Sequence, residues 1–592
     1  MDADAGANGA QGTPEARVAR EPRGTRVTGE TTAAEVFGDG GQPEWYRDSV
    51  VYSLDVKTFH DSDGDGWGDF RGLIDRLDYL EELGVDCLWI RPFYPSPLRD
   101  NGYDVADYRD VDERLGTLDD FDRLVAELDA RGMRLITDLV LNHTSTDHEW
   151  FQRAREDPDS KYHDYYLWTS HVDEAYHTQN IFPEFEDGVW SYDGVAAKHY
   201  FHQFYHHQPD LNVANPDVQE ELCSIAEFWL DRGVDGFRID AAHPMILPKG
   251  HDAHRLEDPQ WLFRELKRRA RAVNDEAVLL AEADDEPDRL DFYFAGGEGF
   301  DALFNFVGNS HVTYGVGVGD TWPLYRMFEQ IPDAQSDGHV WWANFLRNHD
   351  EWNLLKLPHE ALEHAREEFR QGGDGRDSWI FGRGHRLRLA DLYDGDHDRI
   401  AMAHSLLLSL PGTPIVNSGD EIGMHADLDL PKRQAVRTPM RWSADEPNAG
   451  FSTADPADLV IPVDGTGWPG VYQADAASQR GDSGSLFERV ASAVDARKRC
   501  PEISRGDCSV AHVEPNDVWA HRFEHDGRAL LAVHNLASEP RDVVVDFDVD
   551  PADAEHVLGG GDYRVADGGV TVALEGCEYI WLRGETRGAG GR

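Results

Sequence analysis

The chain has 592 residues, which is too long for one hydrophobic core and predicts about two or three domains. Its 112 acidic and 56 basic residues give a formal net charge of −56, which argues against nucleic acid and anionic membranes as partners. Because the carboxylates are spread along the whole length, we expect a halophilic protein from a salt-rich cytoplasm, where salt screens the self-repulsion. The alternative is a merely acidic protein whose charge keeps it soluble.

Neither the N-terminal region nor the cysteines indicate secretion. Residues 1–42 are rich in Ala, Gly, Thr, Arg and Glu and lack the apolar segment of a secretory signal, so we expect a disordered tail. No apolar run reaches the length of a membrane span. The five cysteines are odd in number and none forms a C-x-x-C pair, which argues against disulfides and zinc. We therefore expect a cytoplasmic protein without a membrane partner. The sequence does not decide whether the protein is a monomer or a homo-oligomer.

From residue 43 onward, apolar β-type runs alternate with helical patterns. In the first part, residues 43–142, we expect strands at 51–56, 85–90 and 134–140, with helices at 70–83 and 118–130. The alternation pauses over residues 143–205, a long stretch rich in Asp, His, Tyr and Trp, and such insertions are usually functional. It resumes over residues 206–500, with helices at 218–230 and 259–273 and strands at 236–240, 278–283, 302–306, 340–346 and 415–418. This pattern predicts parallel βαβ units.

Two further regions interrupt or follow this alternation. A polar helical insertion is expected at about 353–390, after the seventh strand. Residues 510–584 contain short strands separated by turn residues, which predicts an antiparallel β-sandwich. Its expected strands are 518–523, 529–532, 543–547, 570–573 and 579–582.

Four apolar or β-prone runs end in a carboxylate, a histidine or both. They are Asp138-Leu-Val-Leu-Asn-His143, Gly236-Phe-Arg-Ile-Asp240, Leu279-Leu-Ala-Glu282 and Phe345-Leu-Arg-Asn-His-Asp350. Buried parallel strands have this apolar composition. Acids at the C-terminal ends of such strands are where a β/α barrel carries its chemistry.

These segments resemble the four signature regions of the α-amylase family of glycoside hydrolases and transglycosidases. Gln208-Pro-Asp-Leu-Asn212 resembles the marker of the family's oligo-1,6-glucosidase and trehalose synthase members. The stretches most similar to trehalose synthases begin at Asn101, Arg347, Ser409 and Arg437. The resemblance implies an α/β fold, a (β/α)8 TIM barrel with an inserted domain B after strand 3 and a C-terminal antiparallel β-sandwich domain.

The resemblance assigns Asp240 as the nucleophile, Glu282 as the acid/base and Asp350 as the acid that binds sugar hydroxyls. Arg238 lies two residues before Asp240 on the same strand face, and we expect this neighbouring cation to keep the nucleophile ionised and to lower its pKa. Glu282 ends an apolar run, and partial burial raises the pKa of a carboxyl group toward the range of a general acid. The expected substrate-binding residues are Tyr103, Asp104, His143, Arg238, His349 and Arg437.

Asp104 and Arg437 match a pair that closes the pocket beyond the terminal glucose in exo-acting members of the family. We therefore expect these two side chains to form an ion pair that limits the substrate to short α-glucosides. The alternative is a surface ion pair of little consequence.

Asp61-Ser-Asp-Gly-Asp-Gly-Trp-Gly-Asp69 places carboxylates on alternate residues, which suits a hard cation. It resembles the family's calcium loop, and the resemblance implies a structural Ca2+. The alternative is a flexible acidic turn in a very acidic protein. No organic cofactor is expected. The implied ligands are Asp61, Asp63, Asp65, the Trp67 carbonyl and Asp69.

The chain departs from its relatives at two places beside the acids. Leu247 stands where trehalose synthases carry a glutamate that helps to hold a second calcium, although Asn142 and Asp210 match two other ligands. The residues after Glu282 are Ala-Asp-Asp-Glu, where relatives usually carry Ala-Asn-Gln-Trp. The second calcium and the acceptor preference therefore both stay open.

The leading functional hypothesis is a retaining enzyme that interconverts maltose and trehalose by intramolecular transglucosylation. The alternative is an exo-acting α-glucosidase or maltase, which would use the same acids and differ only in the access of water. A third class, the family members that have lost catalysis and serve as transporter subunits, needs a membrane anchor and tolerates loss of the acids. The chain keeps Asp240, Glu282 and Asp350, which favours an enzyme.

Overall fold

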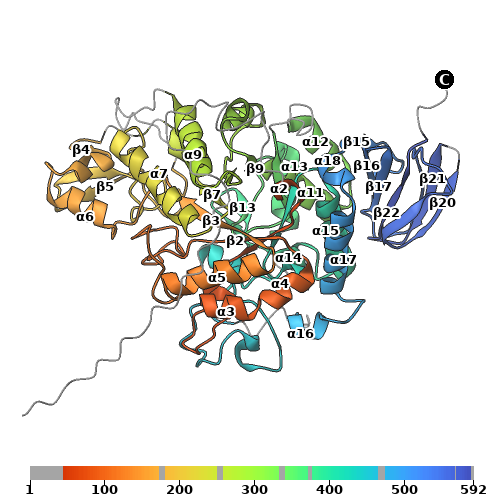
Figure 1. Cartoon of the computed structure of the whole chain (residues 1–592), viewed down its shortest axis with the longest axis horizontal. Coiled ribbons are helices and arrows are strands. Elements are labelled where there is room, and N and C mark those ends of the chain that lie inside the picture. Colours follow the sequence, from red (N-terminus) through yellow and green to blue (C-terminus); the bar gives the residue numbers. More distant parts are fainter. Residues whose placement is uncertain are drawn as a thin grey trace, which may run out of the picture.

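Eight parallel strands form a closed barrel at the centre of the molecule (Figure 1). The computed structural model describes residues 45–172, 180–247, 249, 258–331, 340–370, 377–463, 474–566 and 568–587. The predicted N-terminal tail, residues 1–42, lies outside the described residues. The barrel and the antiparallel sheets that follow it confirm the predicted fold class.

The barrel strands appear in the predicted order along the chain. Around the barrel they are arranged β1-β14-β10-β9-β8-β7-β3-β2. The register pairs Val140 with Asp240, and Ile239 with Ala281, so the residues at the ends of β3, β7 and β8 emerge at one rim. The strands are β1 (Val51–Leu54), β2 (Cys87–Ile90), β3 (Arg134–Val140), β7 (Gly236–Asp240), β8 (Val278–Ala281), β9 (Ala302–Phe304), β10 (Trp342–Phe345) and β14 (Thr413–Asn417).

Local sequence signals explain why the helices cover the barrel where they do. Helix α5 (Leu118–Ala130) begins with a capping box between Thr117 and Asp120 and buries the apolar face that includes Phe121 and Leu124. The other longer helices are α6 (Glu149–Glu156), α7 (Pro216–Asp231), α9 (Pro259–Val273), α11 (Phe306–Val318), α12 (Trp322–Gln330), α15 (His397–Ser409) and α17 (Leu486–Arg499). Short helices include α2 (Trp45–Asp48), α8 (Ala242–Ile246), α10 (Asp291–Phe294), α14 (Leu389–Leu392), α16 (Ala476–Gln479) and α18 (Glu502–Arg505).

The single helix predicted over 70–83 is wrong, because two helices occupy this stretch. Helix α3 (Phe70–Asp75) ends at Arg76, whose φ of −111° is not helical, and α4 (Leu77–Leu83) begins after it. The Arg76 guanidinium bonds His60 at 2.9 Å and lies 4.6 Å from the ring centroid of Trp442. Helix α4 ends at Gly84, as the sequence predicts, in a left-handed conformation that glycine adopts without strain.

Two insertions extend from the C-terminal rim of the barrel. Domain B lies between β3 and α7 and contains α6 and a three-stranded sheet, β4 (Trp168–Thr169), β6 (Lys198–Phe201) and β5 (Trp190–Asp193). The insertion after β10 contains α13 (His359–Glu368), as expected for a helical segment. It also contains a small antiparallel sheet of β11 (Trp352–Asn353), β13 (Gly384–His385) and β12 (Trp379–Ile380), which the sequence reading missed.

The C-terminal strands form two antiparallel sheets that share one apolar core. Figure 1 shows them at the end of the long axis opposite domain B. The five-stranded sheet contains β15 (Asp507–Ala511), β16 (Val518–His525), β17 (Arg528–Asn535), β22 (Tyr579–Glu585) and β19 (Glu555–Gly559). The three-stranded sheet contains β18 (Arg541–Val545), β21 (Gly569–Leu574) and β20 (Asp562–Ala566).

The five-stranded sheet is fixed to the barrel through buried polar contacts with α15. The His521 ring nitrogen lies 2.8 Å from the Ser409 carbonyl, and the His534 ring nitrogen lies 3.0 Å from the Ser405 hydroxyl. Burial lowers the pKa of His521 to about 4, so this interface is built from a neutral imidazole at neutral pH. In the part of the chain that the structure describes, no helix is long and apolar enough to cross a membrane.

Candidate active site

One buried arginine joins three of the carboxylates at the ends of the barrel strands. Arg238 on β7 bonds Asp138 at 2.6 Å and Glu282 at 2.8 Å, and it also bonds Asp240 on its own strand. Its side chain keeps only 2% of its surface accessible. A single guanidinium thus places the predicted nucleophile and the predicted acid/base side by side. The sequence predicted the contact of Arg238 with Asp240 but not its contacts with Asp138 and Glu282.

The backbone after the nucleophile holds Glu282 in place. Ala241 has a φ of 49°, a left-handed conformation that is costly for a residue with a β-carbon. Its N–H donates to the Glu282 carboxylate at 2.9 Å, and the Glu282 N–H donates to the Ile239 carbonyl at 2.9 Å. Such strain persists where the surroundings fix it, which is common at functional sites.

Of the three carboxyl groups bound by Arg238, the two predicted catalytic ones, Asp240 and Glu282, both have raised pKa values. Burial raises the pKa of Asp240 to about 6 and outweighs the lowering effect of Arg238, so the lowered pKa predicted for the nucleophile is wrong. Burial raises the pKa of Glu282 to about 7, and the negative charges of Asp240 and Asp350 add to the effect while Arg238 opposes it. The Glu282 side chain nevertheless keeps 22% of its surface accessible, so a ligand can reach it.

The pKa of Asp350 is shifted in the opposite direction from those of Asp240 and Glu282. Burial alone would raise its pKa, but the guanidinium groups of Arg433 and Arg437 outweigh burial and hold the pKa well below its usual range. Arg437 bonds the Asp350 carboxylate at 2.6 Å, and Arg433 lies 3.1 Å from the same oxygen. Asp350 is therefore an ionised acceptor, which suits hydrogen bonds to sugar hydroxyls.

The predicted aromatic and histidine residues line the floor of this site. The Tyr103 hydroxyl lies 2.7 Å from His349 Nε2, and the two rings are stacked with centroids 5.6 Å apart. His143 is buried and hydrogen-bonded to Gln208 at 3.2 Å. Burial lowers the pKa of His143 to about 4 and that of His349 well below its usual range, so both rings are neutral at neutral pH.

The predicted ion pair between Asp104 and Arg437 is wrong. The fully buried Asp104 carboxylate accepts hydrogen bonds from the Ser96 hydroxyl at 2.9 Å and from the Arg99 N–H at 3.0 Å, within its own loop. Arg437 instead bonds Asp350. The carboxylate that faces the site from this loop is Asp100, which accepts a hydrogen bond from Gln208 at 3.0 Å and acts electrostatically on Arg433. The loop geometry decides between two aspartates that look equally suitable in sequence.

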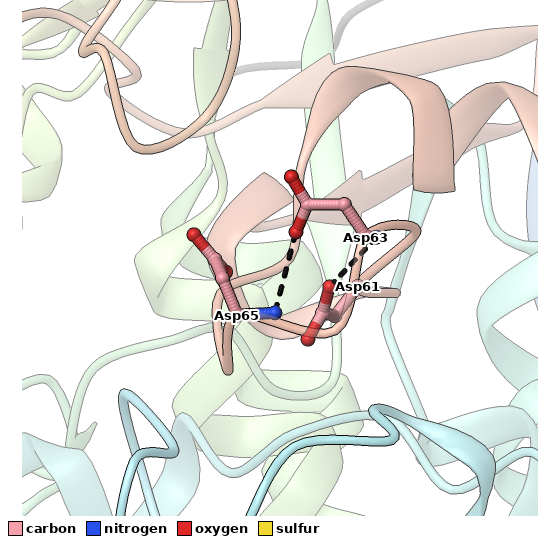
Figure 2. A group of neighbouring side chains, drawn as sticks. All are labelled: Asp61, Asp63 and Asp65. Atoms are coloured by element: carbon pink, nitrogen blue, oxygen red, sulfur yellow. Dashed lines mark hydrogen bonds between the residues drawn. The ribbon is translucent and has the colours of Figure 1, made fainter.

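The acidic loop predicted to hold calcium brings three carboxylates together. Oxygens of Asp61, Asp63 and Asp65 all lie within 4.8 Å of one another (Figure 2). Backbone N–H groups of the loop support this arrangement, because Asp61 accepts from Gly64 at 2.7 Å. Asp69 caps helix α3 by accepting from Gly72 at 2.7 Å and also bonds Ser62. The donor set of hard oxygens fits calcium chemistry.

The residues that match a second calcium site do not fit a metal ion. The Lys249 ammonium group lies 2.9 Å from the Asp210 carboxylate and 2.5 Å from the Asn142 side-chain oxygen. All three residues are buried. A lysine cation therefore already neutralises Asp210 between domain B and the end of β3, and the Leu247 side chain offers no oxygen where relatives carry a glutamate.

The segment after Glu282 forms a polar wall beside the acid/base. The Asp284 carboxylate accepts from the Asn353 amide at 2.9 Å and pairs with Lys356 at 3.0 Å. His243, three residues after Asp240, contacts Asp285 at 3.2 Å. The leaving group must lie next to the acid that protonates it, so these residues border the space for the acceptor.

The sequence profile of the alpha-amylase catalytic domain matches residues 54–506. The chain belongs to the alpha-amylase family. It is 38% identical over 542 residues to a trehalose synthase/amylase of Mycobacterium tuberculosis, covering 89% of this chain and 88% of that protein. It is 36% identical over 560 residues to a trehalose synthase of Pimelobacter, covering 92% and 96%. A trehalulose synthase structure from Pseudomonas mesoacidophila superposes with a TM-score of 0.71 at 28% identity, covering 92% of this chain and all of that one.

This alpha-amylase family site predicts a bell-shaped pH dependence. A reaction that needs Asp240 ionised and Glu282 protonated is lost below about pH 6, where Asp240 gains a proton, and above about pH 7, where Glu282 loses one. The two limbs belong to the pair, because Arg238 couples both groups. Measuring kcat/KM on maltose from pH 4 to 9 should place the maximum between these limbs. A rate that keeps rising to pH 9 would contradict the assignment.

Proposed function

We propose that this protein interconverts maltose and trehalose by intramolecular transglucosylation through a covalent glucosyl-enzyme. The observation that carries the proposal is the buried Arg238, which bonds Asp240 and Glu282 together in a chain whose relatives are named trehalose synthases. Retention requires two carboxyl groups about 5–5.5 Å apart. Asp240 and Glu282 both bind the guanidinium of Arg238, which supports such a short separation.

The steps of the proposed reaction balance without a cofactor. Asp240 attacks the anomeric carbon of the non-reducing glucose of maltose, while Glu282 donates its proton to the glycosidic oxygen. The released glucose turns within the pocket, and its anomeric hydroxyl attacks the glucosyl-enzyme. Glu282 now accepts the hydroxyl proton, Asp240 leaves as a carboxylate, and two inversions give the retained α-linkage. Asp350 holds hydroxyls of the bound glucosyl ring.

Hydrolysis is the competing outcome, as in an α-glucosidase or maltase. Both reactions use the same acids until the glucosyl-enzyme forms, and they diverge when water or glucose attacks it. The aromatic cluster of Phe182, Tyr205 and Phe381 is buried beside the site and favours the exclusion of water. The chain therefore has the features of an isomerase with a protected intermediate.

The decisive experiment incubates the full chain with maltose in concentrated potassium chloride and resolves trehalose from glucose. We expect trehalose as the main product, with glucose as a minor product of leakage. The Asp240→Asn variant is the control, and it should form neither sugar because no covalent intermediate can form. Predominant glucose from the unmodified chain would reject the isomerase and leave the α-glucosidase.

We also propose that the Asp61–Asp65 carboxylates hold a structural calcium ion, with the Trp67 carbonyl and Asp69 as further ligands. The converging carboxylates support this proposal, because they repel one another without a cation. Among the described residues, no hydrogen bond or ion pair joins these carboxylates to Arg238 or its partners, so the ion would act on stability rather than on chemistry.

Calcium removal should therefore lower the unfolding temperature by several degrees and leave the initial rate on maltose at low temperature nearly unchanged. The measurement is calorimetry after chelation and after calcium is restored. The Asp63→Asn/Asp65→Asn variant should lose this response, whereas Asp445→Asn, an exposed aspartate elsewhere, should keep it. An unchanged unfolding temperature on chelation would reject the calcium site.

A further inference from the structure

A separate cavity lies at the opposite end of the barrel from the catalytic acids. It has a volume of about 480 Å³ and is lined by α2, the last turn of α17, α18 and the residues that lead into β2 and β3. Asp86 precedes β2 and Arg134 begins β3, whereas Asp240 and Glu282 stand at the C-terminal ends of their strands. The cavity shares no residue with the active site, and its size is that of pockets that hold small metabolites.

The lining of this cavity carries an excess of cations in a chain whose formal net charge is −56. Four basic and two acidic side chains line it, so its formal charge is positive. Such a local positive charge attracts an anion. The basic residues are Arg134, Arg497, Lys498 and Arg505, and the acidic residues are Asp48 and Asp86.

Two ion pairs join the segments that form the wall. The Lys498 ammonium group lies 2.6 Å from the Asp86 carboxylate, and the Arg505 guanidinium lies 2.6 Å from the Asp48 carboxylate. These pairs connect α17 with the start of β2, and the end of α18 with α2. Both carboxylates can still accept hydrogen bonds from a ligand, because an ionised carboxylate has about four acceptor positions.

Arg497 is a buried cation without a carboxylate partner among the ion pairs of the described residues. Its guanidinium donates three hydrogen bonds to backbone carbonyls at the end of α15 and before β14. Arginine has five N–H donors, so two remain for a ligand. Burial lowers the pKa of Arg497 to about 10, against the raising effect of Asp48 and Asp86, so the group is charged at neutral pH. A buried charge without a partner is costly, and an anion in the cavity would compensate it.

Trp45 adds an aromatic ring to the wall. Its indole N–H donates to the Glu276 carbonyl at 2.9 Å, and the Arg134 guanidinium lies 5.3 Å from its ring centroid. Arg134 is in turn held by Asp235 at 2.9 Å and by the Glu276 carboxylate at 3.0 Å. An aromatic ring beside carboxylates and cations suits a sugar, which has an apolar C–H face and hydroxyls that both donate and accept.

We propose that this cavity binds a phosphorylated monosaccharide, with the phosphoryl group at Arg497 and Lys498 and the sugar ring beside Trp45. A phosphate monoester carries about −1.5 to −2 charges at neutral pH, which matches the excess of two cations in the lining. Its oxygens suit guanidinium and ammonium donors, while Asp48 and Asp86 accept from sugar hydroxyls. The inference is independent of the proposed reaction, because no residue of the active site takes part in it.

The test is calorimetric titration of the full chain, at one fixed concentration of potassium chloride, with glucose 6-phosphate, glucose and potassium phosphate as separate ligands. We expect glucose 6-phosphate to bind at least about tenfold more tightly than glucose or phosphate, because it alone engages both the cations and the ring wall. Lys498→Gln should weaken this binding about tenfold, as for the loss of one charge-assisted contact. Lys498 is exposed, so its replacement should leave folding intact.

The chain provides a matched control for Lys498→Gln. Arg499 is the next residue of α17, is also exposed, pairs with Asp495 at 2.9 Å and does not line the cavity. Arg499→Gln removes the same charge and should change the affinity for glucose 6-phosphate less than about twofold. Asp350→Asn, a change in the active site, should likewise leave this affinity unchanged.

Each outcome decides a separate point. No binding of glucose 6-phosphate, or an equal loss in Lys498→Gln and Arg499→Gln, would overturn the site. Phosphate binding as tight as that of glucose 6-phosphate would overturn the assignment of a sugar. Loss of binding in Asp350→Asn with unchanged binding in Lys498→Gln would place the ligand in the active site and overturn the proposal.

Discussion

The contact between one buried guanidinium and three carboxylates organises this protein. Arg238 binds Asp138, Asp240 and Glu282 in the centre of the barrel, where an unpaired charge would be costly. Burial raises the pKa of the two predicted catalytic carboxyl groups, and the arginine limits that rise. The balance leaves the lower pKa on Asp240 and the higher pKa on Glu282, which is the order that a nucleophile and a general acid need.

The two predicted proton-transfer and nucleophilic groups and the predicted sugar-binding acid are paired with different arginines. Asp240 ends β7, Glu282 follows the neighbouring strand β8, and both bind Arg238. Asp350 follows β10 and depends on Arg437 and Arg433, which come from the segment after β14. Because a different set of cations serves Asp350, its carboxylate stays ionised over the whole pH range in which Glu282 changes its protonation state.

Much of the fold and the catalytic acids could be predicted from sequence because their signals are local. The limits of β3, β7, α5 and α9 follow directly from apolar periodicity and capping residues. The acids stand at the ends of those strands, and Arg238 shares a strand with Asp240. Residues two apart on a strand point to the same face, so this contact does not depend on the rest of the fold.

The errors concern contacts between segments far apart in sequence. Asp100 and Asp104 lie four residues apart in one loop, and only the path of that loop decides which carboxylate faces the site. Arg433 and Lys249 reach partners about 80 and 39 residues away, in the first case after the neighbouring barrel strand, so no local pattern marks them. Arg76, at the break between α3 and α4, likewise contacts His60 and Trp442, which lie outside the helical pattern.

The most direct test of the central claim asks whether Asp240 is the group that forms a covalent bond to the sugar. The full chain is incubated with 5-fluoro-α-D-glucosyl fluoride, which slows the breakdown of a glucosyl-enzyme, and the product is digested and analysed by mass spectrometry. The account predicts one fluoroglucosyl adduct per chain, on the peptide that contains Asp240, and none in the Asp240→Asn variant. An adduct on another carboxylate, or turnover without any adduct, would contradict it.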